Sequence, residues 1–226
     1  MTAHYESVQI ATLYPDAFDV PAPDTAVLLD LWPRKPGVFI RSVPMSADAP
    51  VDVDAPAPLQ LELGHGQFGL VPPWVKSASD AKLRSTKLVN ARAETVTTSN
   101  NFRDTWLAGQ RCIVPMMAFF EDDWRSGKAV PTRITRVDGK PMGVAGLWER
   151  WAKDGTEIIS FTLLTVNANS HALLHRYQHN GIEKRMPVIL GEGAYGAWLS
   201  ARPEKAREFM RAYPAHLLTA NPVEKK

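Results

Sequence analysis

The segment from Arg111 to Val166, RCIVPMMAFFEDDWRSGKAVPTRITRVDGKPMGVAGLWERWAKDGTEIISFTLLTV, decides the fold. Runs rich in β-branched, aromatic and aliphatic residues alternate in it with turn residues, a pattern typical of consecutive β-strands. The predicted strands are Arg111–Val114, Ala118–Glu121, Thr132–Val137, Met142–Trp148 and Ile158–Val166. Gly127-Lys128 and Asp138-Gly139 supply short turns between them, which favours antiparallel pairing.

The flanking sequence extends this pattern. Further strands are predicted at Ser7–Thr12, Gly37–Val43 and Met186–Leu190, with a hairpin that joins Leu59–Leu63 to Gln67–Val71 through Gly64-His65-Gly66. Helices are predicted over Phe102–Ala108 with Asn100 as cap, from Asn169 to about Gln178, and from Pro203 to about Tyr213. Ala78–Leu88 fits a short helix or a loop. Strands outnumber helices, which favours an α+β fold with a mainly antiparallel, barrel-like β-sheet and peripheral helices.

The length of 226 residues, 45% of them apolar, suits one large globular domain or two small ones. We expect a single domain over residues 1–226. Within it, the acidic, Ala- and Pro-rich stretch 45–58 is expected to be a mobile loop, and 214–226 a C-terminal tail.

Cys112 is the only cysteine, so an intramolecular disulfide framework is excluded and a reducing, intracellular setting is expected. No apolar run approaches the roughly 20 residues of a membrane helix. The first six residues carry neither the basic nor the apolar region of a signal peptide. We therefore expect a cytoplasmic protein without membrane contact. A monomer is expected as well.

Charge is unevenly distributed, although the net charge is only +2. Residues 1–74 hold three Lys/Arg against nine Asp/Glu, whereas residues 76–111 hold seven against three. A cluster of cations suits a polyanion such as nucleic acid. The alternative is a solvated surface of mixed charge.

Within the basic stretch, Asn90-Ala91-Arg92-Ala93-Glu94 places an amide, a guanidinium and a carboxylate at alternate positions. If the segment is extended, Asn90, Arg92 and Glu94 project from one face and can present donors and a base to one ligand. The alternative is a polar strand edge or a turn beside the core.

Other residues have the chemistry of a site, each with a structural alternative. Glu121 follows Phe119-Phe120, so desolvation would raise its pKa and suit acid–base work, unless it turns outward. His179 is a second acid–base candidate. Trp74 and Trp124 could stack on bases or pack in the core.

A metal site is not expected, although His171, His175 and His179 are spaced by four. One helix rarely supplies three zinc ligands, and no Cys pair or His-Glu-x-x-His pattern accompanies them. Cys112 lies in an apolar run and is expected to be an inert core residue. No cofactor is expected either.

Taken together and in order, several motifs resemble the SOS-response-associated peptidase (SRAP) family. They are Phe68-Gly69-Leu70-Val71-Pro72-Pro73-Trp74, Asn90-Ala91-Arg92-Ala93-Glu94-Thr95, Phe102-Arg103, Arg111-Cys112-Ile113-Val114-Pro115, Phe119-Phe120-Glu121, Gly146-Leu147-Trp148-Glu149, Phe161-Thr162-Leu163-Leu164-Thr165, and His179 ahead of Arg185-Met186-Pro187-Val188. The match covers about residues 65–200 and the first few residues.

The resemblance implies an abasic-site sensor that binds single-stranded DNA. In the family the N-terminal cysteine bonds covalently to the opened sugar, its amine forming a Schiff base and its thiol closing a thiazolidine. By position, Asn90 would orient the N-terminal residue or the sugar, Glu121 would handle protons on the amine, and His179 would protonate the sugar oxygen. DNA contacts would come from Arg92, Trp74, Arg84, Arg103 and Arg185.

Position 2 departs from the family, because this chain has Thr2 where the family has its cysteine. The start Met1-Thr2-Ala3-His4-Tyr5 otherwise resembles the phage-associated variant. A hydroxyl is a weaker nucleophile than a thiolate, so the crosslink is expected to be impaired, and whether the chain is an enzyme stays open. The alternatives are a self-processing peptidase and a non-catalytic single-stranded DNA-binding module.

Overall fold

Five strands close into a barrel in the computed structural model, which describes residues 2–43 and 60–223. They are β3 (Pro36–Val43), β4 (Gln60–Phe68), β6 (Arg111–Asp123), β8 (Met142–Lys153) and β9 (Thr156–Asn167). The ring runs β9–β4–β3–β6–β8 and returns to β9. Only the β4–β9 ladder in this ring is parallel.

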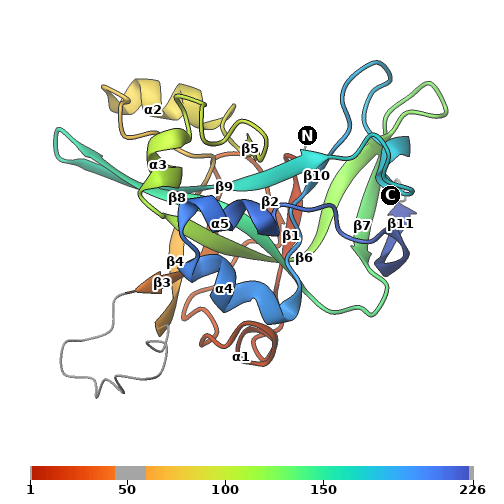
Figure 1. Ribbon diagram of the computed structural model, residues 1–226, viewed down its shortest axis with the longest axis horizontal. Helices are drawn as coiled ribbons and strands as arrows, with labels where there is room; N and C mark the ends of the chain where they lie inside the picture. Colours follow the sequence, from red (N-terminus) through yellow and green to blue (C-terminus); the bar gives the residue numbers. More distant parts are fainter. Residues whose placement is uncertain (1, 44–59, 224–226) are drawn as a thin grey trace.

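Shorter strands extend the sheet at two places (Figure 1). On the far half of β6 lie β1 (Tyr5–Ser7), β2 (Asp30–Leu31), β7 (Val130–Arg136) and β11 (Leu218–Pro222). Beside the end of β9 lie β5 (Asn90–Arg92), which is parallel to it, and β10 (Arg185–Pro187). Thr2 lies just before β1 in the first extension, and Asn90 lies in β5 in the second.

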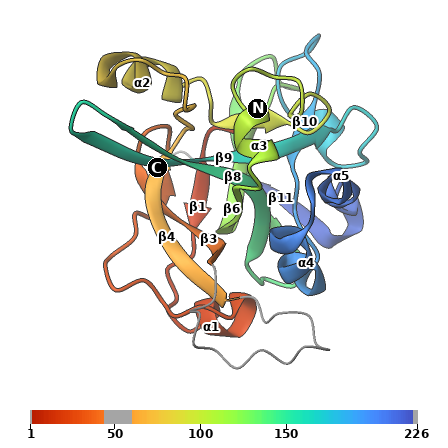
Figure 2. The ribbon, with the colours of Figure 1, turned by 60° about the vertical axis from the view of Figure 1, so that its left-hand side comes forward.

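Helices are short and lie around the barrel (Figure 1, Figure 2). They are α1 (Leu13–Phe18), α2 (Ala78–Ser85), α3 (Arg103–Leu107), α4 (Tyr195–Ser200) and α5 (Pro203–Ala206), with 3-10 turns η1 (Leu174–Arg176), η2 (Glu192–Ala194), η3 (Arg207–Phe209) and η4 (Ala215–Leu217). The predicted α+β class, with a barrel-like sheet and peripheral helices, is confirmed. In the described part of the chain, no helix is long and apolar enough to cross a bilayer.

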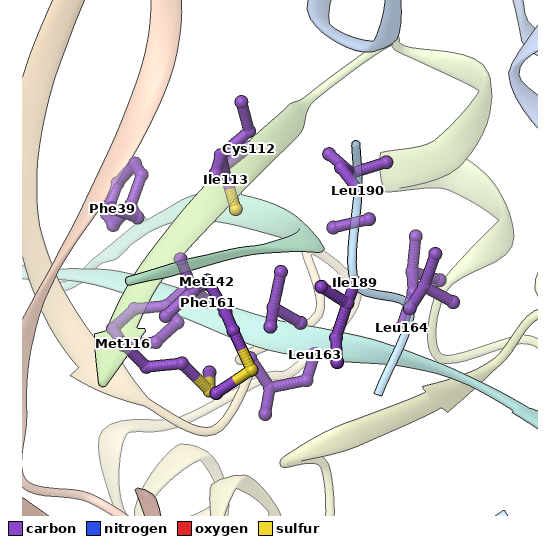
Figure 3. Close-up of a cluster of buried hydrophobic side chains, with 14 of the residues drawn as sticks. Phe39, Cys112, Ile113, Met116, Met142, Phe161, Leu163, Leu164, Ile189 and Leu190 are labelled. Atoms are coloured by element: carbon purple, nitrogen blue, oxygen red, sulfur yellow. The ribbon is translucent and has the colours of Figure 1, made fainter. Parts of the chain in front are cut away.

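The core fills the barrel and the layer under α4. Figure 3 shows Phe39, Ile113, Phe161 and Leu163 converging from three strands of the ring. Cys112 is fully buried among them, and burial raises the pKa of its thiol well above the usual value. It is the core residue that its apolar neighbours predicted.

The predicted hairpin at residues 59–71 is wrong, because β4 runs without a turn through both glycines and pairs with β3 over nearly its whole length. The glycines serve close packing instead. A Cβ on Gly64 would lie 2.8 Å from the ring of Phe39, and one on Gly66 would lie 2.9 Å from the carbonyl oxygen of Ile159. Glycine in a strand interior can mark such close approach as well as a turn.

Other predicted elements differ in extent. The two strands expected around Pro115 are one, β6, and the strand expected at Ser7–Thr12 is shifted to Tyr5–Ser7. The helix expected from Asn169 is replaced by η1, because the Asn169 side chain accepts from the Lys184 backbone instead of capping a helix.

The remaining differences concern helix ends and segment boundaries. Asn100 does not cap α3, whose N-cap is Phe102. The last predicted helix is limited to α5 and η3. Residues 218–222 of the expected tail form β11, and the loop 45–58 lies outside the described residues.

Candidate active site

Thr2, Asn90 and Glu121 meet although 119 positions separate the first from the last. The Thr2 hydroxyl donates to Oε1 of Glu121 at 2.5 Å, and Nδ2 of Asn90 donates to the Thr2 carbonyl at 2.7 Å. Pairing of β1 with β6 brings the start of the chain to Glu121, while pairing of β5 with β9 positions Asn90. All three side chains are buried.

Glu121 is the electrostatic centre of this group. Burial raises the pKa of its carboxyl above the usual value, and hydrogen bonds from Thr2 and Gln178 only partly oppose that effect. The raised pKa of the carboxyl lies closer to neutral pH than the usual value, which suits a group that both takes and returns a proton.

Gln178 is a site residue that the sequence pattern did not single out. Its side chain bonds to both backbone groups of Arg185 and to Glu121, and its backbone donates to Asp122. Its φ of 67° lies in the left-handed region, which costs a non-glycine residue about 1 kcal/mol or more. The surrounding hydrogen bonds hold this conformation and keep the amide against Glu121.

Asn90 has an acceptor to spare. Its Oδ1 is buried and finds no hydrogen-bond partner among the described residues. An unsatisfied buried acceptor costs about 1–3 kcal/mol. Because Nδ2 of the same amide holds Thr2, Oδ1 is placed to accept from a donor that arrives at the site.

His179 lies beside this group and not in it. Its ring is solvent-exposed, its Nδ1 contacts the Asn180 carbonyl at 2.7 Å, and its edge packs on Trp124 with centroids 4.8 Å apart. Among the described residues, no hydrogen bond or ring contact joins the imidazole to Thr2. The histidine is tied to the site through Gln178, the preceding residue.

The Asn90–Glu94 segment is extended only as far as Arg92, so its three polar side chains do not form one ribbon. Arg92 is half-exposed and pairs with Glu183 at 2.9 Å. Glu94 instead accepts from Arg185 at 2.7 Å. Burial opposes ionisation of Glu94, but the bonds from Arg185 outweigh it and lower the pKa of the carboxyl.

The predicted DNA contact of Arg185 does not fit its placement. The side chain is 1% exposed and donates to Glu94, to Glu183 at 2.6 Å and to the carbonyl of Thr165 at 2.6 Å. A phosphate could reach it only after these bonds were broken. Arg185 is a structural cation that joins β10 to β9.

The other predicted DNA contacts lie on α2, α3 and the loop before them. Trp74 is 39% exposed, donates from Nε1 to the Asn100 carbonyl at 2.9 Å, and carries the Arg84 guanidinium 4.7 Å from its ring centre. Arg103 is half-exposed beside Asp104. Arg84 and Arg103 each pair with a carboxylate, Asp80 at 2.7 Å and Asp104 at 3.2 Å, and among the described residues no hydrogen bond joins these groups to Thr2.

A stack of three rings around His4, two positions after Thr2, was also missed. His4 lies between Trp32 and Phe120, with both centroid distances at 4.0 Å and interplanar angles of 12° and 8°. In the sequence these residues are 28 and 116 positions from His4, so only the pairing of β2, β1 and β6 reveals the stack.

The histidines with a spacing of four do not converge. Nδ1 of His171 accepts from the backbone of Leu174, so its Nε2 donates to the Tyr213 carbonyl at 2.7 Å. Nδ1 of His175 contacts the His171 carbonyl at 2.7 Å. Within residues 2–43 and 60–223, no three His, Cys, Asp or Glu side chains gather as a metal site would require.

Comparison with known proteins agrees with the sequence motifs. The family model described as SOS response associated peptidase (SRAP) matches residues 18–226. Abasic site processing protein YoaM of Bacillus subtilis is 33% identical over 168 residues, which cover 71% of this chain and 68% of that protein. Abasic site processing protein HMCES of Gallus gallus is 27% identical over 179 residues, covering 70% and 51% respectively.

The fold agrees as well. A crystal structure of a protein from Bordetella bronchiseptica is 40% identical and has a TM-score of 0.85, covering 99% of this chain and 100% of that one. A second, from Bacteroides thetaiotaomicron, is 23% identical with a TM-score of 0.75, and covers 98% and 91%. Because the family model matches nearly the whole length of the chain, the chain belongs to the SOS response associated peptidase family.

Proposed function

We propose that this chain recognises an abasic site in single-stranded DNA and forms a reversible Schiff base between the α-amine of Thr2 and the aldehyde of the opened sugar. The observation that carries the proposal is the capture of Thr2 by Glu121 and Asn90 in a buried site. The family, and relatives named abasic site processing proteins, support the choice of lesion.

The chemistry starts with removal of Met1, which turns the nitrogen of Thr2 into a primary amine. The neutral amine adds to the aldehyde carbon to give a carbinolamine, and loss of water gives the imine. Glu121 takes the proton that the ammonium form must lose, and then returns it to the departing hydroxyl. The raised pKa of its carboxyl suits both steps.

The Thr2 hydroxyl limits how long the adduct lasts. Addition of Oγ1 to the imine carbon, with its proton passing through Glu121 to the nitrogen, closes an oxazolidine ring. The hydroxyl is a weaker nucleophile than a thiolate, and an oxazolidine reopens more readily than a thiazolidine. The product therefore stays in exchange with the imine and with free aldehyde.

Neighbouring side chains complete the site. His179 donates from Nδ1 to the Asn180 carbonyl, so its Nε2 can give a proton to the sugar ring oxygen during opening when the ring is in the imidazolium form. Arg92 binds a phosphate after exchanging its partner Glu183. Arg84, Arg103 and Trp74 continue the path of the strand.

The test is incubation with single-stranded DNA that carries one abasic site, followed by a denaturing gel with and without borohydride. We expect a shifted band only with borohydride, which reduces the imine to a stable amine. T2C should give a band without reductant, and E121Q should weaken the borohydride-dependent band roughly tenfold or more, as loss of an acid–base group does. Absence of any affinity for this DNA at low salt would overturn the proposal.

A second candidate is a non-catalytic single-stranded DNA-binding module. It is favoured by the 1% exposure of Thr2, whose hydroxyl and carbonyl already have partners. In that case E121Q would bind DNA as the wild type does, and no borohydride-dependent band would form. A retained Met1, detected by intact-mass measurement, would argue against self-processing.

A further inference from the structure

The three stacked rings near Thr2 come from β6 and from the residues next to β1 and β2. Trp32 follows β2, His4 precedes β1, and Phe120 lies in β6. The Phe120 backbone donates to the His4 carbonyl at 3.0 Å, so these two residues face each other across the ladder. Their neighbours Tyr5 and Phe119 are fully buried, which places the stack on the outer face of the sheet.

The stack is rigid and ends in an accessible ring. Asp30 contacts Nε2 of His4 at 2.6 Å and fixes the imidazole between the other two rings. Trp32 covers His4 on one side and is still 49% exposed. A large apolar ring that is held in place and open to solvent on one side is what a stacking platform requires.

Two cations lie two and three positions after Trp32 in the sequence. Arg34 and Lys35 are exposed and, in the described part of the chain, have no ion-pair partner. They are two of only three Lys/Arg in residues 1–74, which carry nine acidic residues. Their backbone is held against β4, because the Arg34 backbone donates to the Phe68 carbonyl at 2.6 Å and the Phe68 backbone donates to the Lys35 carbonyl at 2.9 Å. Arg34 has a φ of 69°, in the left-handed region.

The platform adjoins the reacting residue. His4 is two positions from Thr2, so their Cα atoms are at most about 7 Å apart. Phe120 directly precedes Glu121 in β6, so the stacked rings and the Glu121 carboxyl lie one residue apart on opposite faces of that strand. We infer that Trp32, with Arg34 and Lys35, forms a subsite for the nucleotide next to the abasic residue. The base stacks on the indole, and the cations bind its phosphates.

An unpaired nucleobase is the occupant that fits these groups together. A flat ring stacked in parallel on others presents a π-face, and every base offers one in return. Lysine and arginine beside it match the phosphates that flank a base and would not favour a purely apolar partner. This inference rests on the proposed function, since it places the subsite beside an abasic sugar.

The test is a binding cycle with fluorescein-labelled single-stranded DNA that carries one tetrahydrofuran residue, an unreactive abasic analogue, read by anisotropy. A second DNA also lacks the base on the 5′ side of this residue, and a third also lacks the base on its 3′ side. W32A should weaken binding of the first DNA roughly tenfold, and W32F much less. On one of the other two DNAs, wild type and W32A should bind equally.

Matched controls separate the subsite from general damage. L29A removes a side chain that is also 49% exposed, three positions upstream, and should bind as the wild type does. R34Q combined with K35Q should reduce the salt slope of log K by about 1.4, or about 0.7 for each phosphate that the variant no longer neutralises. W32A binding within about twofold of wild type, or weakening by the same factor on all three DNAs, would overturn the subsite. Failure of the wild type to bind any of them would overturn the proposed function instead.

Discussion

At the scale of single residues, Glu121 links stability to chemistry. Because burial raises the pKa of its carboxyl in the folded chain, the folded state holds this proton at pH values where the unfolded state has lost it. The contribution of Glu121 is complete below its ordinary pKa of about 4.3 and is lost as pH rises through the higher folded value.

E121Q should therefore be more stable than wild type at about pH 7–8, since glutamine retains hydrogen bonding without a charge to bury. Each unit of pKa shift corresponds to about 1.4 kcal/mol of unfolding free energy. For a chain of this size, each kcal/mol changes Tm by about 2–4 °C. Calorimetry from about pH 4 to 8 checks this, and the gain should vanish toward the acid end. A gain that is independent of pH would contradict the role of ionisation.

Arg185 provides a second prediction at this scale. R185M leaves Glu94 and Glu183 without their shared cation and should reduce the free energy of unfolding by about 2–4 kcal/mol. The matched variant R92Q, at a half-exposed arginine paired with the same Glu183, should cost less than about 1 kcal/mol. Urea unfolding compares the two, and equal losses would show that burial of Arg185 is unimportant.

Sequence reasoning found residue types better than it found residue environments. Asn90 and Glu121 could be selected because an amide in a polar motif and a carboxylate after two aromatic residues carry chemical meaning. Arg185 could not be separated from Arg92, because an arginine has the same letter whether it is buried against carboxylates or exposed. Gln178 and Trp32 acquire their meaning only from partners that are distant in sequence.

At the scale of elements, the glycines in β4 mark contacts between strands. G66A would place a Cβ 2.9 Å from the backbone oxygen of Ile159 in β9, and backbone cannot rotate away as a side chain can. The expected loss is about 1–3 kcal/mol of unfolding free energy. G191A is the control, because no atom of residues 2–43 or 60–223 lies within 4 Å of a Cβ there. A thermal melt of G66A that matches that of G191A would contradict the packing argument.

Strands were predictable where alternation or β-branched runs were long, as in β8 and β9. Turns and helix ends were not, because the same residues have other uses. Gly64 and Gly66 have the composition of a turn, yet they admit a ring and a carbonyl from neighbouring strands. Asn169 has the composition of a helix cap, yet its side chain accepts from Lys184 across a loop.

At the scale of the whole molecule, pairing between strands that are distant in the sequence assembles the site. The chain's start is held by β6, Asn90 by β9, and Gln178 by β10, and β8 joins β6 to β9. The order of strands along the chain does not reveal this arrangement, because β1 ends at Ser7 and pairs with a strand that begins only at Arg111. The prediction that Thr2, Asn90 and Glu121 share one site came from the family resemblance and not from the local sequence pattern.

The most direct test of the account is to locate the reduced adduct. After the wild-type chain is incubated with abasic single-stranded DNA and borohydride, the protein is digested and the modified peptide is sequenced by mass spectrometry. We expect a sugar remnant on the α-nitrogen of Thr2 in a chain that lacks Met1. A remnant on a lysine side chain, or an adduct on a chain that retains Met1, would contradict it.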